Sequence, residues 1–173
     1  MAQFGGPKLV KALYFDSEAK EQLVKGINKI ADAVSSTLGA SGRTVVIEDD
    51  FGNPYVTKDG VTVANSIMLM DPVENLGASM MKQAAQQTAN IAGDGTTTSI
   101  VLTQAIIDCY NKLKAKQFSF RDIKSGINKF KDNVIELLES KAIDVDDKKL
   151  DDVSIISANN DKKLGLLISD AFK

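Results

Sequence analysis

Residues 90–99, NIAGDGTTTS, combine residue types that suit an anion site. Gly93 and Gly95 flank Asp94, and glycine tolerates backbone angles that bring a turn close to another group. Three threonines follow and lead into an apolar run, so a helix starting here offers unpaired N–H groups, its positive dipole end and hydroxyl donors. Asp94 would repel a phosphate unless a cation lay between them, and Mg²⁺ accepts one or two carboxylates beside phosphate ligands. The pattern is compatible with a nucleotide phosphate site or with a plain turn between helices.

Two further clusters could contribute to such a site, and each also has a purely structural interpretation. TLGASGR, residues 37–43, follows an amphipathic segment, and its Gly39 is placed to end a helix. TKDG, residues 57–60, puts Lys58 and Asp59 after a predicted strand, where a charged turn is the default. The GDGTTT run does not fit the Walker pattern, which needs a lysine next to its closing glycine. Spacing alone therefore leaves both the ligand and the connector interpretation open.

The elements that would position these clusters are mostly helical. Apolar spacings of three and four predict helices over residues 17–38, 72–92, 96–116 and 119–142, with Asp71 before Pro72 as a cap. Two β-rich runs, 44–48 and 54–58, flank the turn-rich DDFGN and predict a hairpin. The residues expected to face the core are Leu23, Ile27, Ile30, Val34 and Leu38 in the first helix, Val73, Leu76, Met80 and Ala84 in the second, and Ile100, Val101, Ala105 and Ile106 in the third.

The residue composition of the sequence changes near residue 140. IDVDDKKLDDV, residues 143–153, is strongly charged and is expected to be a loop or short connecting segment. Residues 154–173 follow and end in a helical pattern. We therefore expect a domain or subdomain boundary near residue 140.

Composition narrows the possible chemistry. The chain has 173 residues with a 43% hydrophobic and a 25% charged share, which is ordinary for a globular protein. It has no histidine, so histidine acid–base chemistry and most zinc sites are excluded. The net charge of −2 implies no general attraction to nucleic acid or anionic membrane, and no apolar run is long enough to span a bilayer. One cysteine fits a reducing compartment, and we expect a cytoplasmic protein. Core or interface positions are expected for Cys109, Met68, Met70, Met80 and Met81.

An ordered set of motifs carries a family resemblance. From about residue 10 onward the chain resembles the amino-terminal part of the group I chaperonins, the Hsp60 or GroEL type. The resemblance is carried by DAVSSTLGASGRTVVIEDDFGNPYVTKDGVTVANSI, ENLGASMMKQAAQQTANIAGDGTTTSIVLTQAII and SANND. The resemblance implies a mainly α fold. Residues 1–140 would form the first half of a helical equatorial domain with a small β-hairpin, and 141–173 the start of an intermediate hinge domain. The apical domain and the second equatorial half would lie outside this chain, which would leave helix faces exposed for self-association.

The resemblance also implies a set of site residues. Asp59 would assist hydrolysis near the attacking water, and Asp94 would hold the Mg²⁺. The nucleotide would be bound by Thr37, Leu38, Gly39, Ala40, Lys58, Asp94, Gly95, Thr96, Thr97 and Thr98. Ala40 and Ser41 depart from the TLGPKG that is common in the family, so the loop would be looser and nucleotide affinity altered.

The implied function is that of an ATP-dependent, Mg²⁺-dependent ATP hydrolase of the chaperonin type. Its subunits would form a homo-oligomeric ring that assists the folding of non-native polypeptides, with K⁺ as a further candidate cofactor and a co-chaperonin lid as a candidate partner. No nucleic acid or membrane partner is expected. Two alternatives stay open: a chaperonin-derived assembly module that binds nucleotide without productive turnover, and a small-molecule kinase, which lacks a separate acid–base cluster here.

Overall fold

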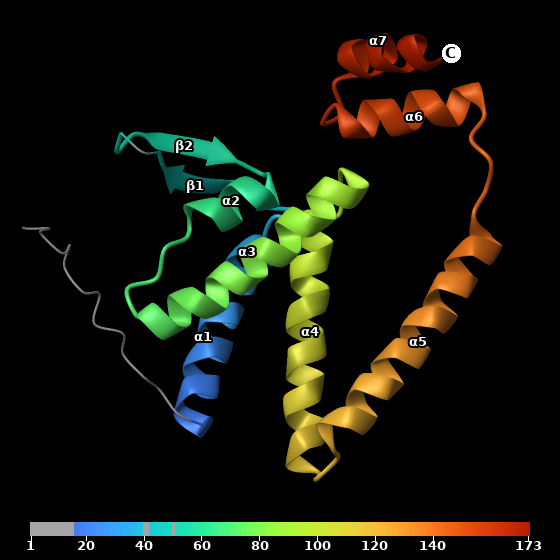
Figure 1. Cartoon of the computed structure of the whole chain (residues 1–173). Helices are drawn as coiled ribbons and strands as arrows, with labels where there is room; N and C mark the ends of the chain where they lie inside the picture. Colours follow the sequence, from blue (N-terminus) through green and yellow to red (C-terminus); the bar gives the residue numbers. More distant parts are fainter. Residues whose placement is uncertain (1–15, 40–41, 50) are drawn as a thin grey trace, which may run out of the picture. The chain divides into compact units, whose positions relative to one another are not determined.

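The computed structural model describes residues 16–39, 42–49 and 51–173 (Figure 1). Contacts divide the chain into two compact units, Met1–Phe118 and Ser119–Lys173. The first unit contains α1 (Asp16–Ser35), β1 (Val45–Glu48), β2 (Pro54–Thr57), α2 (Gly60–Ser66), α3 (Pro72–Ala92) and α4 (Thr96–Ala115). The second contains α5 (Phe120–Lys141), α6 (Asp147–Ser157) and α7 (Lys162–Phe172). This mainly helical architecture with a small hairpin confirms the expected fold class.

The core of the first unit lies where α1, α2, α3 and α4 meet. Its best-buried large side chains are Ile30 and Val34 from α1, Val63 from α2, Met81 from α3 and Ile100 from α4. Because these residues come from all four helices, the core fixes the ends of α1, α2 and α4 relative to one another.

Two glycines let α1 and α3 cross in close backbone contact. A Cβ at Gly26 would lie 1.8 Å from the carbonyl oxygen of Glu74, and one at Gly77 would lie 2.2 Å from that of Leu23. Any larger residue would push the helices apart, because backbone atoms cannot rotate away as side chains do.

The hairpin forms as expected. Its strands are antiparallel, with Val45 opposite Thr57 and Glu48 opposite Pro54. The turn is closed by Asp49, whose Oδ1 accepts the N–H groups of Phe51 at 2.9 Å and Asn53 at 2.8 Å. Strand β2 ends at Thr57 and α2 begins at Gly60, so only Lys58 and Asp59 connect the two elements.

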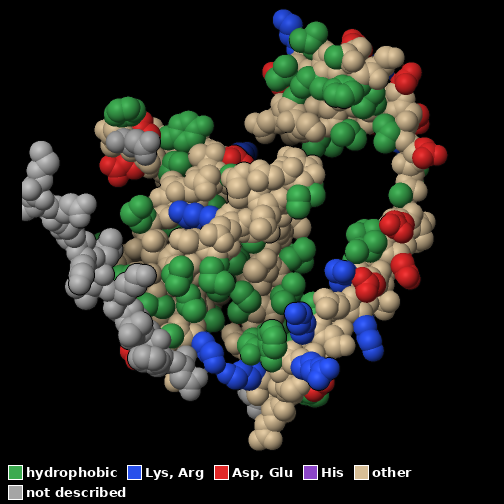
Figure 2. All heavy atoms as spheres, in the orientation of Figure 1, with side chains coloured by type: hydrophobic (Ala, Val, Ile, Leu, Met, Phe, Trp, Pro, Cys, Tyr) green, Lys and Arg blue, Asp and Glu red, His purple; other side chains and the backbone are tan. Residues whose placement is uncertain are grey.

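The predicted buried faces of α3 and α4 are partly wrong. Leu76 and Met80 are more than half exposed, and α3 buries Gly77, Ala78, Met81 and Ala85 instead. Because Gly77 forms the crossing with α1, the buried face of α3 is the one that Gly77, Met81 and Ala85 share at spacings of four, and Leu76 and Met80 lie on the neighbouring face. In α4 Ile100 is buried as expected, Val101 is partly buried, and Ala105 and Ile106 are exposed. Figure 2 shows hydrophobic side chains on the visible surface of the first unit.

The expectation of a loop or short connecting segment at residues 143–153 is also partly wrong. Only 142–146 lack secondary structure, and α6 begins at Asp147, capped by Asp146, whose Oδ1 accepts the N–H of Lys149 at 2.8 Å. This short helix packs on α7, where a Cβ at Gly165 would lie 2.5 Å from Ile155 Cα. Most of its charged residues are exposed, but Asp151 faces α7 and its Oδ1 accepts the Ser169 hydroxyl at 2.5 Å. The assignment of residues 1–140 and 141–173 to equatorial and intermediate domains stays a prediction.

The sulfur-containing residues divide between core and surface. Met81 is buried, whereas Met80 is more than half exposed, Met68 and Met70 are almost fully exposed and Cys109 is exposed. The core prediction is therefore correct for Met81 and wrong for the other four, for which an interface position stays a prediction. No helix in the described ranges is long and apolar enough to cross a membrane.

Candidate functional site

Two of the predicted clusters meet where α2 and α4 begin. A Cβ at Gly60 would lie 2.0 Å from Thr97 Oγ1 and 3.2 Å from both Thr97 Cβ and Val34 Cγ1. The TKDG segment and the GDGTTT loop, far apart in sequence, are thus in direct contact, and the end of α1 packs against the same point. This contact places Asp59, which precedes Gly60, next to the first turn of α4.

Asp59 caps α2 and is held by three donors. Its Oδ2 accepts the N–H of Thr62 at 2.9 Å and the Thr62 hydroxyl at 2.5 Å, and its Oδ1 accepts the N–H of Val61 at 3.4 Å. Its own N–H donates to Thr57 Oγ1 at 3.0 Å. Partial burial acts to raise the pKa of Asp59, but the bonds from Thr62 and Val61 together outweigh it, so the pKa lies below its usual value. Asp59 is therefore an ordered, ionised carboxylate at neutral pH.

The GDGTTT loop depends on its two glycines. Gly93 ends α3 with φ 73° and Gly95 precedes α4 with φ 83°, both in the left-handed region that other residues rarely adopt. Asp94 lies exposed between them, and its Oδ1 accepts the N–H of Gly95 at 2.6 Å. The second carboxylate oxygen of Asp94 faces no hydrogen-bond donor among the described residues.

The start of α4 has no side-chain cap. Gly95 offers no side-chain acceptor, and the first helical bond runs from Ser99 N–H to the carbonyl oxygen of Gly95. By contrast, α2, α3, α5, α6 and α7 each begin with an Asp or Ser whose side chain accepts a backbone N–H. The N–H groups of Thr96, Thr97 and Thr98 are therefore available at the positive end of a 20-residue helix, the arrangement that suits an anion.

The end of α1 comes earlier than the sequence predicts. The hydroxyls of Ser35, Ser36 and Thr37 donate to carbonyl oxygens three residues back, at 3.0, 2.7 and 2.7 Å. These bonds occupy the last carbonyls and favour a tight turn over a continued helix. Thr37 is buried with its hydroxyl already bonded, whereas Leu38 and Gly39 are exposed and Gly39 has φ 77°.

The structure says less about the other residues that the sequence predicts for the site. Lys58 is exposed beside Asp59, and Ala40 lies outside the described residues. No group of three or more His, Cys, Asp or Glu side chains within the described ranges could hold a metal by itself. A single carboxylate such as Asp94 fits Mg²⁺, which keeps several waters and completes its coordination with phosphate oxygens.

A groove of about 400 Å³ runs beside the loop, between the end of α3 and the start of α4. Its hydroxyl groups belong to Thr88, Ser99 and Thr103, and each donates to a backbone carbonyl of its own helix. The groove therefore presents mainly methyl groups, together with the exposed side chain of Ile91.

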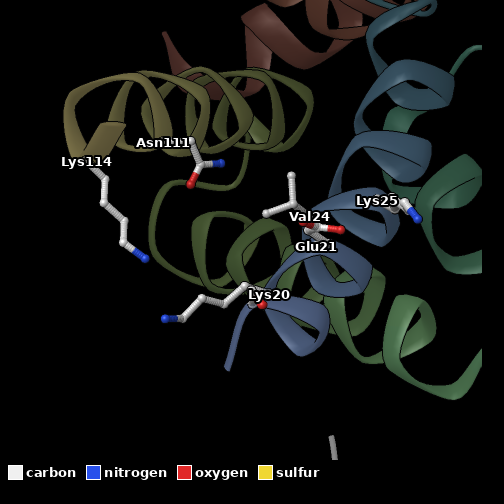
Figure 3. Close-up of a pocket in the computed structure, with 7 residues that line it drawn as sticks. Lys20, Glu21, Val24, Lys25, Asn111 and Lys114 are labelled. Carbon is white, nitrogen blue, oxygen red and sulfur yellow. The ribbon is translucent and has the colours of Figure 1, made fainter. Parts of the chain in front are cut away.

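A second groove, of about 450 Å³, lies at the opposite end of α4, where it meets the start of α1. Figure 3 shows Lys20 and Lys114 extending from the two helices toward the same side of this groove. Because α4 is 20 residues long, about 30 Å separate this groove from the GDGTTT loop. It includes none of the residues that the sequence predicts for the site.

Comparison with known proteins identifies the family. The sequence pattern of the TCP-1/cpn60 chaperonin family matches residues 30–173. The chain belongs to this chaperonin family. Members of the family are generally ATPases and form oligomeric rings. The match includes Asp59, the GDGTTT loop and the SANND run on which the resemblance was drawn.

Two solved chaperonin structures resemble this chaperonin chain. One is the chaperonin gp146 from the bacteriophage EL 2 (Pseudomonas aeruginosa) in the presence of ATP-BeFx, with 34% identity and a TM-score of 0.77, covering 90% of this chain and 28% of that chain. The other is a group III chaperonin in the open state, with 26% identity and a TM-score of 0.74, covering 89% and 31%. The chain thus spans less than a third of the length of the chaperonins it matches.

Two features of the site escaped the sequence analysis. Helix α2 was not predicted, because GVTVANS is short and rich in β-branched residues. Thr62 was consequently not connected with Asp59. The available signal was the Asp-x-x-Thr spacing, which is typical of a residue three positions into a helix bonding back to its cap.

Proposed function

We propose that this chain is the nucleotide-binding part of an ATP-driven chaperonin subunit, in which Asp94 holds Mg²⁺ and Asp59 assists hydrolysis. The observation that supports the proposal is the contact between Gly60 and Thr97, because Asp59 directly precedes Gly60 and Thr97 lies in the uncapped first turn of α4. The presence of ATP-BeFx in the matched bacteriophage chaperonin supports a nucleotide as the anion.

The residues present fit a magnesium nucleotide. Thr96, Thr97 and Thr98 offer backbone N–H groups to phosphate oxygens, and Asp94 offers one carboxylate oxygen to the metal. When bound, Mg²⁺ would neutralise phosphate charge, which is the main requirement of phosphoryl transfer. Asp59 would accept a hydrogen bond from the attacking water, and no covalent nucleophile is needed.

Binding of MgATP tests the first half of the proposal. Asp94→Asn should weaken Mg²⁺-dependent ATP binding about tenfold or more, since a charge-assisted metal contact is lost. Without Mg²⁺ the same substitution should not weaken ATP binding and should strengthen it, because it removes a charge that repels the phosphates. The matched control is Asp152→Asn, which alters an exposed carboxylate on α6. Equal MgATP affinity for the two variants, measured by calorimetry on the complete gene product, would contradict the metal assignment.

The alternative is a chaperonin-derived assembly module that binds nucleotide without turnover. The replacement of the usual Pro and Lys by Ala40 and Ser41 favours it. MgATP binding with no detectable phosphate release would select the module. Phosphate transfer to a small acceptor would instead select a kinase.

The proposal extends to the complete assembly. Subunits of the group I type would form a homo-oligomeric ring in the cytoplasm and assist folding of non-native polypeptides, with K⁺ as an additional cofactor and a lid protein as partner. The surface supports association, because large hydrophobic side chains such as Ile91 and Leu102 are exposed on the first unit. Sedimentation of the complete gene product would test the ring, and a monomer at micromolar concentration would contradict it.

A further inference from the structure

We propose that Thr62 is a positioning residue for the reaction: its hydroxyl fixes the Asp59 carboxylate so that Oδ1 faces the attacking water. This inference rests on the proposed function, in which Asp59 assists ATP hydrolysis. In that step a water oxygen bonds to the γ-phosphorus, the bond from the γ-phosphorus to the bridging oxygen breaks, ADP leaves, and the proton of the water passes to Asp59 and then to solvent.

The two oxygens of Asp59 are used unequally. Oδ2 accepts two bonds, both from Thr62, at 2.9 Å from the backbone N–H and 2.5 Å from the hydroxyl. Oδ1 accepts one long contact, at 3.4 Å, from the N–H of Val61. Since a carboxylate oxygen has two lone-pair sites, Oδ2 is saturated and Oδ1 keeps capacity for another donor. The Thr62 hydroxyl therefore decides which oxygen can serve a water molecule.

The hydroxyl bond goes beyond what capping a helix requires. Asp71 caps the longer helix α3 with Oδ1 alone, which accepts the N–H groups of Val73 and Glu74 at 2.8 and 2.9 Å. Asp146 and Asp161 each cap a helix by accepting one backbone N–H. Among these Asp caps of the described helices, only Asp59 also receives a side-chain hydroxyl.

Thr57 and Thr62, on either side of Asp59 in the sequence, hold different parts of it. The Thr57 hydroxyl accepts the Asp59 N–H at 3.0 Å and so fixes the backbone, while Thr62 fixes the carboxylate. Thr57 is buried, Thr62 is half-buried and Asp59 itself is exposed, so the bonds order a carboxylate that remains accessible to water. Thr62 contacts the reacting groups only through Asp59, which makes its role one of positioning.

The experiment compares Thr62→Val, which keeps the shape and removes the hydroxyl, with Thr62→Ser, which keeps the hydroxyl. In steady-state ATP hydrolysis by the complete gene product, Thr62→Val should lower kcat about tenfold, the value of one charge-assisted bond. MgATP affinity should stay within about twofold, and Thr62→Ser should stay close to wild type. In an Asp59→Asn background the Thr62→Val substitution should have no further effect on kcat, because Thr62 acts through the carboxylate.

A second readout does not depend on activity. In the nucleotide-free chain, NMR titration of the Asp59 carboxyl carbon should give a higher pKa for Thr62→Val than for Thr62→Ser, because a donor to the ionised form is lost. Lys58, the adjacent charged side chain, is the same in both variants. A pKa that does not distinguish the two variants overturns the inference, whether or not the wild type hydrolyses ATP.

The outcomes separate the inference from the function on which it rests. If Asp59→Asn abolishes turnover but Thr62→Val does not change kcat, the positioning role is wrong and the proposed function stands. If Asp59→Asn hydrolyses ATP like wild type, both are wrong. A loss of kcat in Thr62→Val that persists in the Asp59→Asn background would show that Thr62 acts independently of the Asp59 carboxylate, which also overturns the inference.

Discussion

Replacing Gly60 with alanine should open the contact on which the site depends. The added Cβ would lie 2.0 Å from Thr97 Oγ1 and 3.2 Å from Val34 Cγ1. Rotation of the Thr97 side chain cannot relieve the whole clash, because Thr97 Cβ itself is 3.2 Å away. The start of α2 must therefore move away from α4, or Thr97 must take another rotamer.

The size of the effect follows from two opposing contributions. Overpacking in a filled core costs about 1–3 kcal/mol. Alanine in place of a helical glycine raises the free energy of unfolding by up to about 1 kcal/mol. We expect Gly60→Ala to lose about 1–2 kcal/mol, which lowers the Tm by about 2–8 °C in a chain of this length.

The assay is thermal and urea unfolding beside a matched control. Gly126→Ala makes the same change within α5, where a Cβ would meet nothing within 4 Å, so it should stabilise the chain by about 0.5–1 kcal/mol. The two substitutions should have opposite signs. If Gly60→Ala is as stable as Gly126→Ala, the packing of α2 against α4 is not as described and the candidate site loses its basis.

Two further predictions concern the ends of α2. Because the pKa of Asp59 is lowered in the folded chain, its stabilising contribution is present above its unfolded pKa of 3.8 and is lost as the pH falls through the lower folded value. The stability advantage of wild type over Asp59→Asn should thus shrink between about pH 5 and pH 2 in urea titrations, and a constant difference would contradict the lowered pKa. At the other end, Lys82 Nζ donates to the carbonyl oxygens of Ile67 at 2.6 Å and Asn65 at 3.2 Å. Lys82→Met should cost about 1–2 kcal/mol in unfolding free energy, whereas the exposed Lys124→Met should be neutral, and equal effects would exclude a role in holding α2.

The glycine loop and the longer helices could be predicted because their signals are local. Gly93 and Gly95 need left-handed backbone angles, and Asp71 before Pro72 marks a helix start within four residues of sequence. Such features do not depend on the rest of the fold. The hairpin follows from its turn residues in the same way.

The packing could not be predicted because it depends on contacts between distant segments. The burial of Met81 in place of Met80 follows from the crossing of α1 and α3 at their glycines, which no periodicity within α3 reveals. Likewise, nothing near residue 60 indicates that its missing Cβ makes room for Thr97. The family resemblance groups Asp59 with the GDGTTT loop, but the contact of Gly60 with Thr97 that brings the two segments together is seen only in the fold.

Turnover of MgATP by the complete gene product and by its Asp59→Asn variant is the most direct test of the proposed site. Asparagine caps helices about as well as aspartate, so the variant should keep α2 and lose only the charge. We predict that kcat falls about 100-fold or more while MgATP affinity changes less than about threefold. Equal kcat in wild type and variant would contradict the role of Asp59 and leave it as a helix cap.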